Sequence, residues 1–458
     1  MDSTTLVIGS MIGSGIFIVS ADAARLLSSP GLLILAWILT AALTVIGALC
    51  YGELAAAMPR AGGQYVYLRE AFGPVCGFLY GWTTFLVINT GSIAAVAVAF
   101  AKFLGILVPS ISSSNTVFAS VTTEQLTAIL SIAVLTLLNC FGIRLGAWVQ
   151  NIFTFTKTAV LLALALLVFF LGSSYQGFAV NFDDFWRNAD WSMSTLTLLG
   201  VAMVGPLFAF DAWYGVTFTG AEIKNPRRNL PLSMIVGVGT VSVLYIMINF
   251  VYLGLLPLEG SPDGVGPIAR GIQYASEDRV GTAAAQVIFG SQGVGLMALF
   301  IMISVFGCNN GLILSGARVY YAMARDNLFF SAVGRVHPRY HTPVISLVVQ
   351  GVWASVLALS GTYSQLLDYI IFAVLLFLML TIAGLFVLRR KRPEMERPYR
   401  AWGYPVLPIL YLVLAGFIEV NLLIYKPEYT WPGLIIVLLG LPVYYLWRRF
   451  SGSPSVRQ

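Results

Sequence analysis

The sequence has 458 residues, of which 58% are hydrophobic and only 10% are charged, and its mean hydropathy is +0.84. Soluble globular chains carry about 25% charged residues, so this composition excludes that class. The net charge of +6 could indicate nucleic acid or an acidic partner. The basic residues, however, concentrate in particular loops, which is typical of orientation signals in membrane proteins. A single transmembrane domain over residues 1–458 is predicted.

Twelve apolar segments are predicted to cross the membrane as helices, because each is long enough for a hydrocarbon core of about 30 Å. Their approximate limits are 5–27, 31–58, 74–108, 124–143, 146–171, 195–220, 231–256, 294–325, 343–361, 364–388, 404–425 and 432–448. A segment at about 265–290 is too short and too polar to span, so an external re-entrant or surface helix is expected there. The predicted fold class is an all-α membrane protein.

Basic residues lie mainly in alternate loops. With the N-terminus inside, the cytoplasmic loops hold the run Arg389-Arg390-Lys391-Arg392 and most of the other arginines, whereas acidic residues dilute the few basic residues of the external loops. This asymmetry follows the positive-inside rule. Both termini are therefore predicted to be cytoplasmic.

The first span contains an unusual density of small residues. Gly9, Gly13 and Gly15, together with Ser10 and Ser14, are poor helix formers in a segment that must satisfy its own backbone. A helix opened there would expose carbonyls on one half and partly positive amides on the other, which suit the ammonium and carboxylate groups of an amino acid. The alternative is close helix packing through Gly9 and Gly13.

A second interrupted span favours the broken-helix interpretation. The predicted sixth helix contains Pro206, Asp211 and Gly215. Five spans precede it, so helices 1 and 6 each begin one of two five-helix halves. Interrupted helices at matching places in two halves indicate a transporter site. We therefore predict a five-plus-five inverted repeat, with repeat 1 at about 5–171, repeat 2 at about 195–390, helices 1 and 6 discontinuous, and helices 11 and 12 at about 404–449 outside it.

Six motifs at these spans are similar to those of a known family. They are Ile12-Gly-Ser-Gly-Ile-Phe17, Tyr51-Gly-Glu-Leu54, Pro59-Arg-Ala-Gly-Gly-Gln-Tyr-Val-Tyr67, Phe208-Ala-Phe-Asp-Ala-Trp213, Glu222-Ile-Lys-Asn-Pro-Arg-Arg-Asn-Leu-Pro231 and Gly316-Ala-Arg-Val-Tyr-Tyr-Ala-Met-Ala-Arg-Asp326. Over nearly its whole length the chain resembles the amino acid–polyamine–organocation superfamily, and within it the L-type amino acid transporter family, most closely its bacterial members. The resemblance implies twelve spans, alternating access and sodium-independent exchange of amino acids in a bacterial cytoplasmic (inner) membrane.

The resemblance also implies a substrate site. Its members would be Ile12, Gly13, Ser14, Gly15, Phe208, Ala209 and Asp211. In that site the amides of Ser14 and Gly15 would hold the substrate carboxylate, carbonyls of Ile12, Phe208 and Asp211 would hold its amine, and the ring of Phe208 would act as an outer gate. The family often has Gly-Trp in the helix 6 break, where this chain has Ala212-Trp213. Trp213 is assigned to gating, and a less flexible break is expected.

Two residues outside the breaks are predicted to take part in coupling. Lys157 lies inside the fifth span, where a lysine costs about 2.5–3.5 kcal/mol and should have a partner. The resemblance implies that its ammonium bonds carbonyls of helix 1 and replaces the sodium ion of sodium-coupled relatives; a snorkelling lysine is the alternative. Tyr245 matches a family tyrosine linked to the same region, although simple packing is an alternative.

Other polar residues have simpler expected roles. Asp211 could bind a cation or relay protons, but N-capping of the second half of helix 6 is favoured. Salt bridges are expected for Glu53 and Glu222 near the cytoplasmic ends, and bonds between helices for Asn309 and Asn310. Metal binding by His337 and His341 is not expected. Glu419, in helix 11, is left without an explanation.

The predicted function is exchange of neutral, small to medium-sized L-amino acids without sodium. Helix 3 contains no Asp or Glu, and helix 8 contains none before Asp326, so an acidic partner for a cationic substrate is not expected. The alternatives are a proton-coupled amino acid permease and a cationic amino acid or polyamine permease. An enzyme is not predicted, because no nucleophile–base pair lies in the spans. No cofactor, metal or nucleic acid is expected, and the transporter is expected to be a monomer without an accessory subunit.

Overall fold

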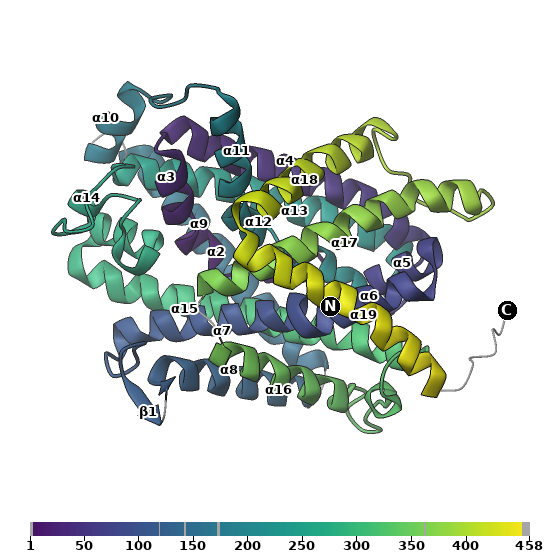
Figure 1. Ribbon diagram of the computed structural model, residues 1–458. Helices are drawn as coiled ribbons and strands as arrows, with labels where there is room; N and C mark the ends of the chain where they lie inside the picture. The colour runs from purple at the N-terminus through teal and green to yellow at the C-terminus, as the bar shows by residue number, and fades with distance from the viewer. Residues whose placement is uncertain (1–2, 119, 142, 172–174, 361–362, 451–458) are drawn as a thin grey trace.

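The computed structural model describes residues 3–118, 120–141, 143–171, 175–360 and 363–450, and Figure 1 shows helices over nearly all of them. Helices dominate because a backbone in hydrocarbon must satisfy its hydrogen bonds within the segment. The described chain adds one small antiparallel hairpin of β1 (Thr116–Phe118) and β2 (Val121–Thr122). The prediction of an all-α membrane protein is confirmed.

The helices of the first six predicted spans are α1 (Ser3–Met11), α2 (Gly15–Ile18), α3 (Ser20–Leu27), α4 (Pro30–Ala57), α6 (Pro74–Thr83), the π-helix η1 (Thr84–Ile88), α7 (Asn89–Leu107), α8 (Thr123–Cys140), α9 (Ile143–Leu171), α11 (Met193–Ala202), α12 (Val204–Ala209) and the 3₁₀ helix η3 (Trp213–Glu222). Those of the other six are α13 (Pro226–Leu255), α15 (Val280–Arg325), α16 (Val344–Ser360), α17 (Tyr363–Lys391), α18 (Val406–Tyr425) and α19 (Pro427–Phe450). The connecting segments contain α5 (Gln64–Phe72), α10 (Gln176–Asp183), α14 (Pro267–Arg270), η4 (Ser276–Asp278) and η5 (Ser331–Gly334).

Every predicted span lies on a helix or a broken helix. Among the described residues, ten segments are long and apolar enough to cross a bilayer, and the pair Ser3–Ile18 and Ser20–Leu27, bent by 49°, makes an eleventh. The remaining predicted span corresponds to α16, an apolar helix of 17 residues. The chain is therefore a multi-pass integral membrane protein.

The predicted surface segment at about 265–290 contains α14, η4 and the first part of α15. Gly290 interrupts α15 with a φ of 65° and a ψ of −155°, a conformation that glycine adopts without the steric cost of a Cβ. The helix that follows this kink is the eighth span, close to where the sequence places it.

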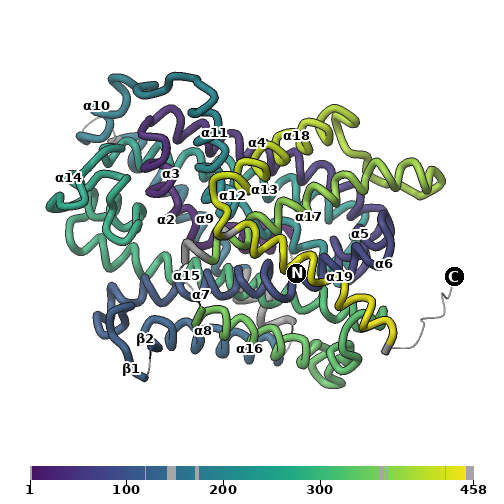
Figure 2. Tube along the Cα trace, viewed as in Figure 1, coloured from purple at the N-terminus to yellow at the C-terminus, as the bar shows by residue number. Residues whose placement is uncertain are grey.

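The elements are arranged along one axis, with different connections at each end. In Figures 1 and 2, α10, α14 and the β-hairpin lie at one end, whereas α5 and the loop between α17 and α18 lie at the other. We call the first the outer end and the second the inner end, after the predicted orientation. In the middle, α1 packs against α9, α13 and α15, and α12 packs against α2. The two broken helices are therefore enclosed by the other spans.

Ion pairs tie distant segments together at the inner end. The carboxylate of Glu53, which is 1% exposed, accepts a hydrogen bond of 2.6 Å from Arg389 and lies 3.3 Å from Arg397. Its Oε2 also accepts from the amide of Ala401 (2.7 Å), so the loop between α17 and α18 is bound to the end of α4. Arg318 pairs with Glu222 at 3.1 Å. The predicted salt bridges of Glu53 and Glu222 are confirmed.

A second inner contact joins α5 to the end of α15. Arg69 pairs with Asp326, and the Tyr65 hydroxyl donates to the same carboxylate at 2.8 Å. Burial and the neighbouring Asp326 carboxylate raise the pKa of Tyr65 above its ordinary value, so the hydroxyl remains a donor. This bond holds the loop helix α5 against the eighth span.

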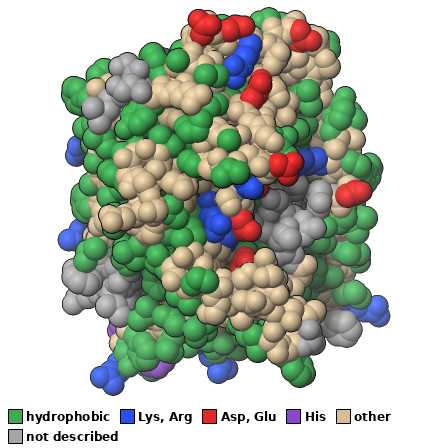
Figure 3. All heavy atoms as spheres, turned by 90° about the vertical axis from the view of Figure 1, so that its left-hand side faces the viewer, with side chains coloured by type: hydrophobic (Ala, Val, Ile, Leu, Met, Phe, Trp, Pro, Cys, Tyr) green, Lys and Arg blue, Asp and Glu red, His purple; other side chains and the backbone are tan. Residues whose placement is uncertain are grey.

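The outer end has a smaller set of charged contacts. Figure 3, which views this end, shows basic and acidic side chains mixed among hydrophobic ones. Arg25 of α3 donates to Asp278 Oδ1 and to the Gln273 carbonyl, both at 2.7 Å. The second part of helix 1 is thereby attached to the segment between helices 7 and 8.

Candidate substrate site at two helix breaks

Helix 1 is interrupted between α1 and α2. Residues Ile12–Ser14 are not helical, and the amide of Phe17 donates to the Ser14 carbonyl at 3.0 Å, which is a tighter turn than an α-helix makes. The interruption coincides with the predicted glycine-rich segment. The predicted break in helix 1 is confirmed.

Helix 6 is interrupted between α12 and η3, at Phe210–Ala212. Ala212 has a φ of 69° and a ψ of −2°, a left-handed conformation that costs an L-residue about 1–2 kcal/mol. Glycine would adopt it without that cost, which gives a physical basis to the expected stiffness of this break. The prediction that Asp211 caps the second half is wrong, because Ala212 occupies the N-cap position.

The two breaks approach each other closely at Gly15. A Cβ added there would lie 2.7 Å from the Cα of Ala209, so no larger residue fits between helix 1 and helix 6 at this point. A Cβ at Gly13 would lie 2.9 Å from the Cys308 sulfur. The sequence offered two interpretations of the glycine-rich segment of helix 1, close helix packing and an opened helix. The structure has both within the same few residues.

One cavity lies between the breaks. Its walls are Ser10, Met11, Gly13, Ser14 and Gly15 of helix 1, Phe208, Ala209, Asp211 and Ala212 of helix 6, Ser92 and Val96 of α7, and Cys308 and Leu312 of α15. The structure thus brings together six of the seven residues predicted to bind substrate. The exception is Ile12, whose carbonyl instead accepts from Lys157 at 2.6 Å.

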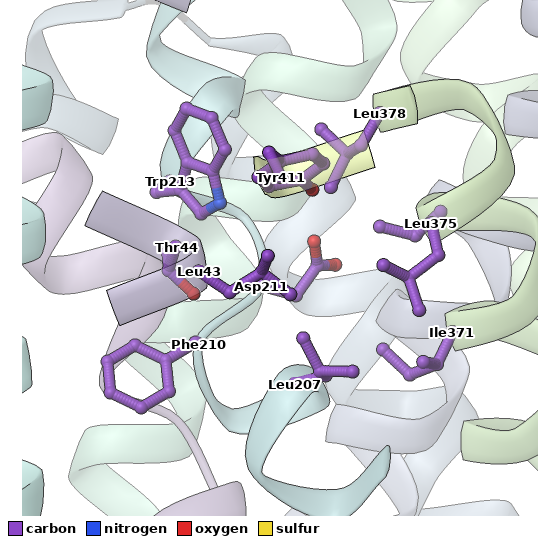
Figure 4. Close-up of a pocket in the computed structure, with 11 residues that line it drawn as sticks. Leu43, Thr44, Leu207, Phe210, Asp211, Trp213, Ile371, Leu375, Leu378 and Tyr411 are labelled. Carbon is purple, nitrogen blue, oxygen red and sulfur yellow. The ribbon is translucent and has the colours of Figure 1, made fainter. Parts of the chain in front are cut away.

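Asp211 borders three cavities. The first is the cavity between the breaks, and the second lies toward Tyr80, Thr84 and Tyr214. Figure 4 shows the third, in which the carboxylate points into a space enclosed by leucines of helices 2, 6 and 10, with Trp213 and Tyr411 at its edge.

The carboxyl group of Asp211 lacks a full set of partners. Its Oδ1 is buried without a hydrogen-bond partner among the described residues. The expectation of a neutral pocket rested on helices 3 and 8, whereas helix 6 contributes the residue Asp211, already among the predicted site residues, to the cavity wall.

Lys157 of α9 is completely buried beside the helix 1 break. Its ammonium donates to the carbonyls of Gly9 and Ile12 and, at 3.4 Å, to that of Ser304 in α15. An amine surrounded by carbonyls satisfies backbone groups that the interrupted helix leaves open. The predicted contact with helix 1 is confirmed, and the snorkelling alternative is wrong.

Tyr245 of α13 connects the two breaks. Its hydroxyl lies 2.9 Å from the Met11 carbonyl at the end of α1 and 3.3 Å from the Ala209 carbonyl at the end of α12. The ring packs edge-on against Trp37 and Phe210. The Tyr245 hydroxyl thus contacts a carbonyl of each broken helix. The alternative of simple packing therefore does not describe all of its contacts.

Helices 3 and 8 supply wall residues that the sequence did not single out. Ser92, Val96, Cys308 and Leu312 line the cavity. Ser92 and Cys308 carried a signal as polar or small residues inside apolar spans, whereas Val96 and Leu312 carried none. Asn309 donates to the Ile93 carbonyl at 3.3 Å, and Asn310 accepts from Asn139 at 2.8 Å. The predicted bonds between helices by these two asparagines are confirmed.

Helix 3 also contains an irregularity that no sequence signal predicted. The π-helix η1 separates α6 from α7, and the Thr90 hydroxyl donates to the Phe85 carbonyl at 2.6 Å, five residues back. Such π-bulges are frequent at functional sites. This one places Thr84, Ile88 and Asn89 on the wall of the second cavity.

Comparisons with known proteins agree with this architecture. Residues 1–444 match the amino acid permease family. The chain is 31% identical to the serine/threonine exchanger SteT of Bacillus subtilis, over 98% of this chain and 96% of that protein. It is also 31% identical to the human large neutral amino acids transporter small subunit 2 (98% and 80%) and 29% identical to the human b(0,+)-type amino acid transporter 1 (98% and 87%). The family match over residues 1–444 and these relatives, together with the two interrupted helices, show that this chain belongs to the amino acid permease family.

Proposed function

We propose that the chain exchanges neutral, small to medium-sized L-amino acids across a bacterial cytoplasmic membrane by alternating access, without sodium. The observation that carries the proposal is the cavity between the two helix breaks, with Gly13–Gly15 on one wall and Phe208, Ala209 and Asp211 on the other. Backbone groups of an interrupted helix can bind a carboxylate at one half and an ammonium at the other. A zwitterionic amino acid carries both charges.

Three further proposals complete this function. The amides of Ser14 and Gly15 bind the substrate carboxylate, the carbonyls of Phe208 and Asp211 bind its amine, and the Phe208 ring gates the outer side. Helices 1–5 and 6–10 form an inverted repeat, with both termini cytoplasmic. The protein transports rather than catalyses, and it works as a monomer without an accessory subunit. The relative named as a serine/threonine exchanger supports exchange of small neutral substrates.

Independence from sodium is supported by Lys157. Its ammonium lies between the helix 1 carbonyls and Ser304 of helix 8, so a positive charge is already present at these oxygens. A sodium ion there would meet like-charge repulsion at close range. Exchange rather than net uptake remains a proposal, with proton-coupled uptake as its competitor.

A second candidate is transport of cationic amino acids, and Asp211 favours it. A buried guanidinium or ammonium headgroup needs an acidic partner. Asp211 borders all three cavities, and one of its carboxyl oxygens is buried without a hydrogen-bond partner among the described residues. The family also contains a relative named as a b(0,+)-type transporter.

A counterflow assay in proteoliposomes across the twenty amino acids tests the proposal. We expect exchange of small and medium-sized neutral amino acids, equal in sodium and in choline medium, and no uptake into vesicles empty of amino acid. Uptake into empty vesicles driven by a pH gradient would contradict exchange. Competition by arginine alone, abolished in Asp211→Asn, would replace the neutral substrate class with the cationic one.

A further inference from the structure

The second cavity adjoins the first, which lies between the two helix breaks, on its inner side. The two cavities share the wall residues Ser92, Asp211, Ala212 and Leu312. Along helix 3, which runs from the inner to the outer end, the first cavity extends from Ser92 to Val96 and the second from Ser92 back to Tyr80. At a rise of about 1.5 Å per residue, Thr84 lies about 12 Å further inward than Ser92.

Helices 6 and 8 run in the opposite direction and show the same displacement. On helix 6 the first cavity begins at Phe208, and the second continues to Phe218. On helix 8 the first cavity begins at Cys308, and the second ends at Ser315. All three helices therefore place the second cavity between the first cavity and the inner end of the protein.

Two hydroxyl groups on the wall of the second cavity have no hydrogen-bond partner among the described residues. They belong to Tyr80 and Thr84, which are 1% and 0% exposed. The two residues lie four positions apart on helix 3, so they share a helix face and their hydroxyls can contact one ligand. A buried hydroxyl without a partner costs free energy and calls for an explanation.

Other hydroxyls of the same wall are already engaged within their own helices. Ser92 donates to the Ile88 carbonyl at 2.7 Å, and Ser315 donates to the Gly311 carbonyl at 2.8 Å, as hydroxyls inside helices commonly do. Thr84 begins the π-helix η1, and its hydroxyl makes no such bond in the described structure. Since π-helical turns are frequent at functional sites, this unengaged donor indicates a ligand.

An ion pair joins two helices directly below the second cavity. Arg318, three residues beyond Ser315 on helix 8, pairs at 3.1 Å with Glu222, four residues beyond Phe218 on helix 6. The Arg318 side chain is only 3% exposed. The second cavity thus shares a wall with the first cavity and is separated from the inner surface by this pair.

We propose that the second cavity is an inner binding site, which the transported amino acid occupies between the first cavity and the cytoplasm. The ligand class is a zwitterionic α-amino acid. The hydroxyls of Tyr80 and Thr84 donate to its carboxylate, and its ammonium lies toward Asp211, which borders both cavities. The inference rests on the proposed function, because it needs an amino acid that crosses the protein by this route.

The test compares the two faces of the membrane in right-side-out and inverted vesicles, each with saturating amino acid on the opposite side. Cleavage of the loop between α17 and α18 by added protease reports which vesicles expose the inner end. Tyr80→Phe and Thr84→Val each remove one hydroxyl and keep the shape. We expect the half-saturating concentration at the inner face to rise about tenfold in each, the effect of losing one hydrogen bond to a charged group. The value at the outer face should not change.

Three variants serve as controls. Thr84→Ser keeps the hydroxyl and should retain the wild-type value at the inner face. Tyr252→Phe and Thr282→Val should change neither face, because their hydroxyls are also buried without a partner among the described residues but line none of the three cavities. An unchanged inner value in Tyr80→Phe and Thr84→Val, or an equal change at both faces, overturns the inner site.

A second measurement covers substitutions that prevent folding. Saturating amino acid at the inner face should slow the reaction of Ser315→Cys with a maleimide, and a lack of protection overturns the inner site. If only arginine and lysine are exchanged, the neutral substrate class of the proposed function fails, while the same comparison of faces, made with arginine, still decides on the inner site. If no amino acid is exchanged, both fail.

Discussion

Replacing Lys157 with methionine is the most direct test of how the helix 1 break is held open. The side chain keeps a similar length but loses the ammonium that contacts the carbonyls of Gly9 and Ile12 and, less closely, Ser304. Because Lys157 is 0% exposed, water does not replace the lost donor in the packed structure. The carbonyls at the break are then left buried and unsatisfied.

The magnitude follows from the two short contacts. A hydrogen bond to a charged group contributes about 1.5–3 kcal/mol, and an unsatisfied buried carbonyl costs about 1–3 kcal/mol. The variant no longer buries an ammonium, which offsets part of this loss. We therefore expect the broken-helix geometry to lose about 3–5 kcal/mol, in the range found when one partner of a buried polar pair is removed. Since 1.4 kcal/mol corresponds to a factor of ten, exchange should fall at least 100-fold.

The assay is counterflow of a neutral amino acid in proteoliposomes, together with the melting temperature of the purified protein in detergent. Lys102→Met is the matched control, because Lys102 is a lysine of another span whose ammonium lies 3.8 Å from the exposed Glu277 at the outer end. Its loss should cost less than about 1 kcal/mol. If Lys157→Met exchanges at the wild-type rate and melts at the same temperature, the carbonyl contacts do not hold the break and the reasoning is wrong.

Three other substitutions test separate parts of the structure. Tyr245→Phe keeps the ring but removes the hydroxyl, whose single proton is shared between the Met11 and Ala209 carbonyls. At about 0.5–1.5 kcal/mol for this hydrogen bond, exchange should fall several-fold in counterflow, and an unchanged rate would contradict the bridging role. Ala212→Gly removes the strain of about 1–2 kcal/mol that the left-handed backbone imposes on alanine, while glycine loses more conformational entropy on folding. The melting temperature should therefore stay equal or rise. A clear fall would refute the strain at Ala212. Glu53→Gln breaks a buried ion cluster and should destabilise by about 3–5 kcal/mol, seen as faster proteolysis of the loop between α17 and α18. Glu396→Gln is the control, because Glu396 forms an exposed ion pair with Arg227 whose loss should cost less than about 1 kcal/mol. Equal rates of proteolysis in the two variants would argue that the buried Glu53 cluster does not hold this loop.

The sequence by itself determined the membrane class, the positions of the spans and the two helix breaks. These properties are local: hydrophobic length fixes a span, and a concentration of Gly, Pro and Ser weakens a helix wherever it lies. Lys157 could also be predicted to have a partner, since a buried ammonium in a span must find oxygen atoms. The resemblance to a family tyrosine located Tyr245, although not the bonds that it makes.

Tertiary structure alone decided which groups meet. Asp211 looked like a helix cap from its neighbours in sequence, whereas the left-handed Ala212 takes that position and Asp211 borders three cavities. The walls formed by Ser92 and Cys308, and the π-bulge in helix 3, depend on packing between segments hundreds of residues apart. That both carboxyl oxygens of Glu419 are buried without a hydrogen-bond partner among the described residues is likewise visible only in the folded chain. Burial and pairing are properties of the assembled helices, and no local pattern encodes them.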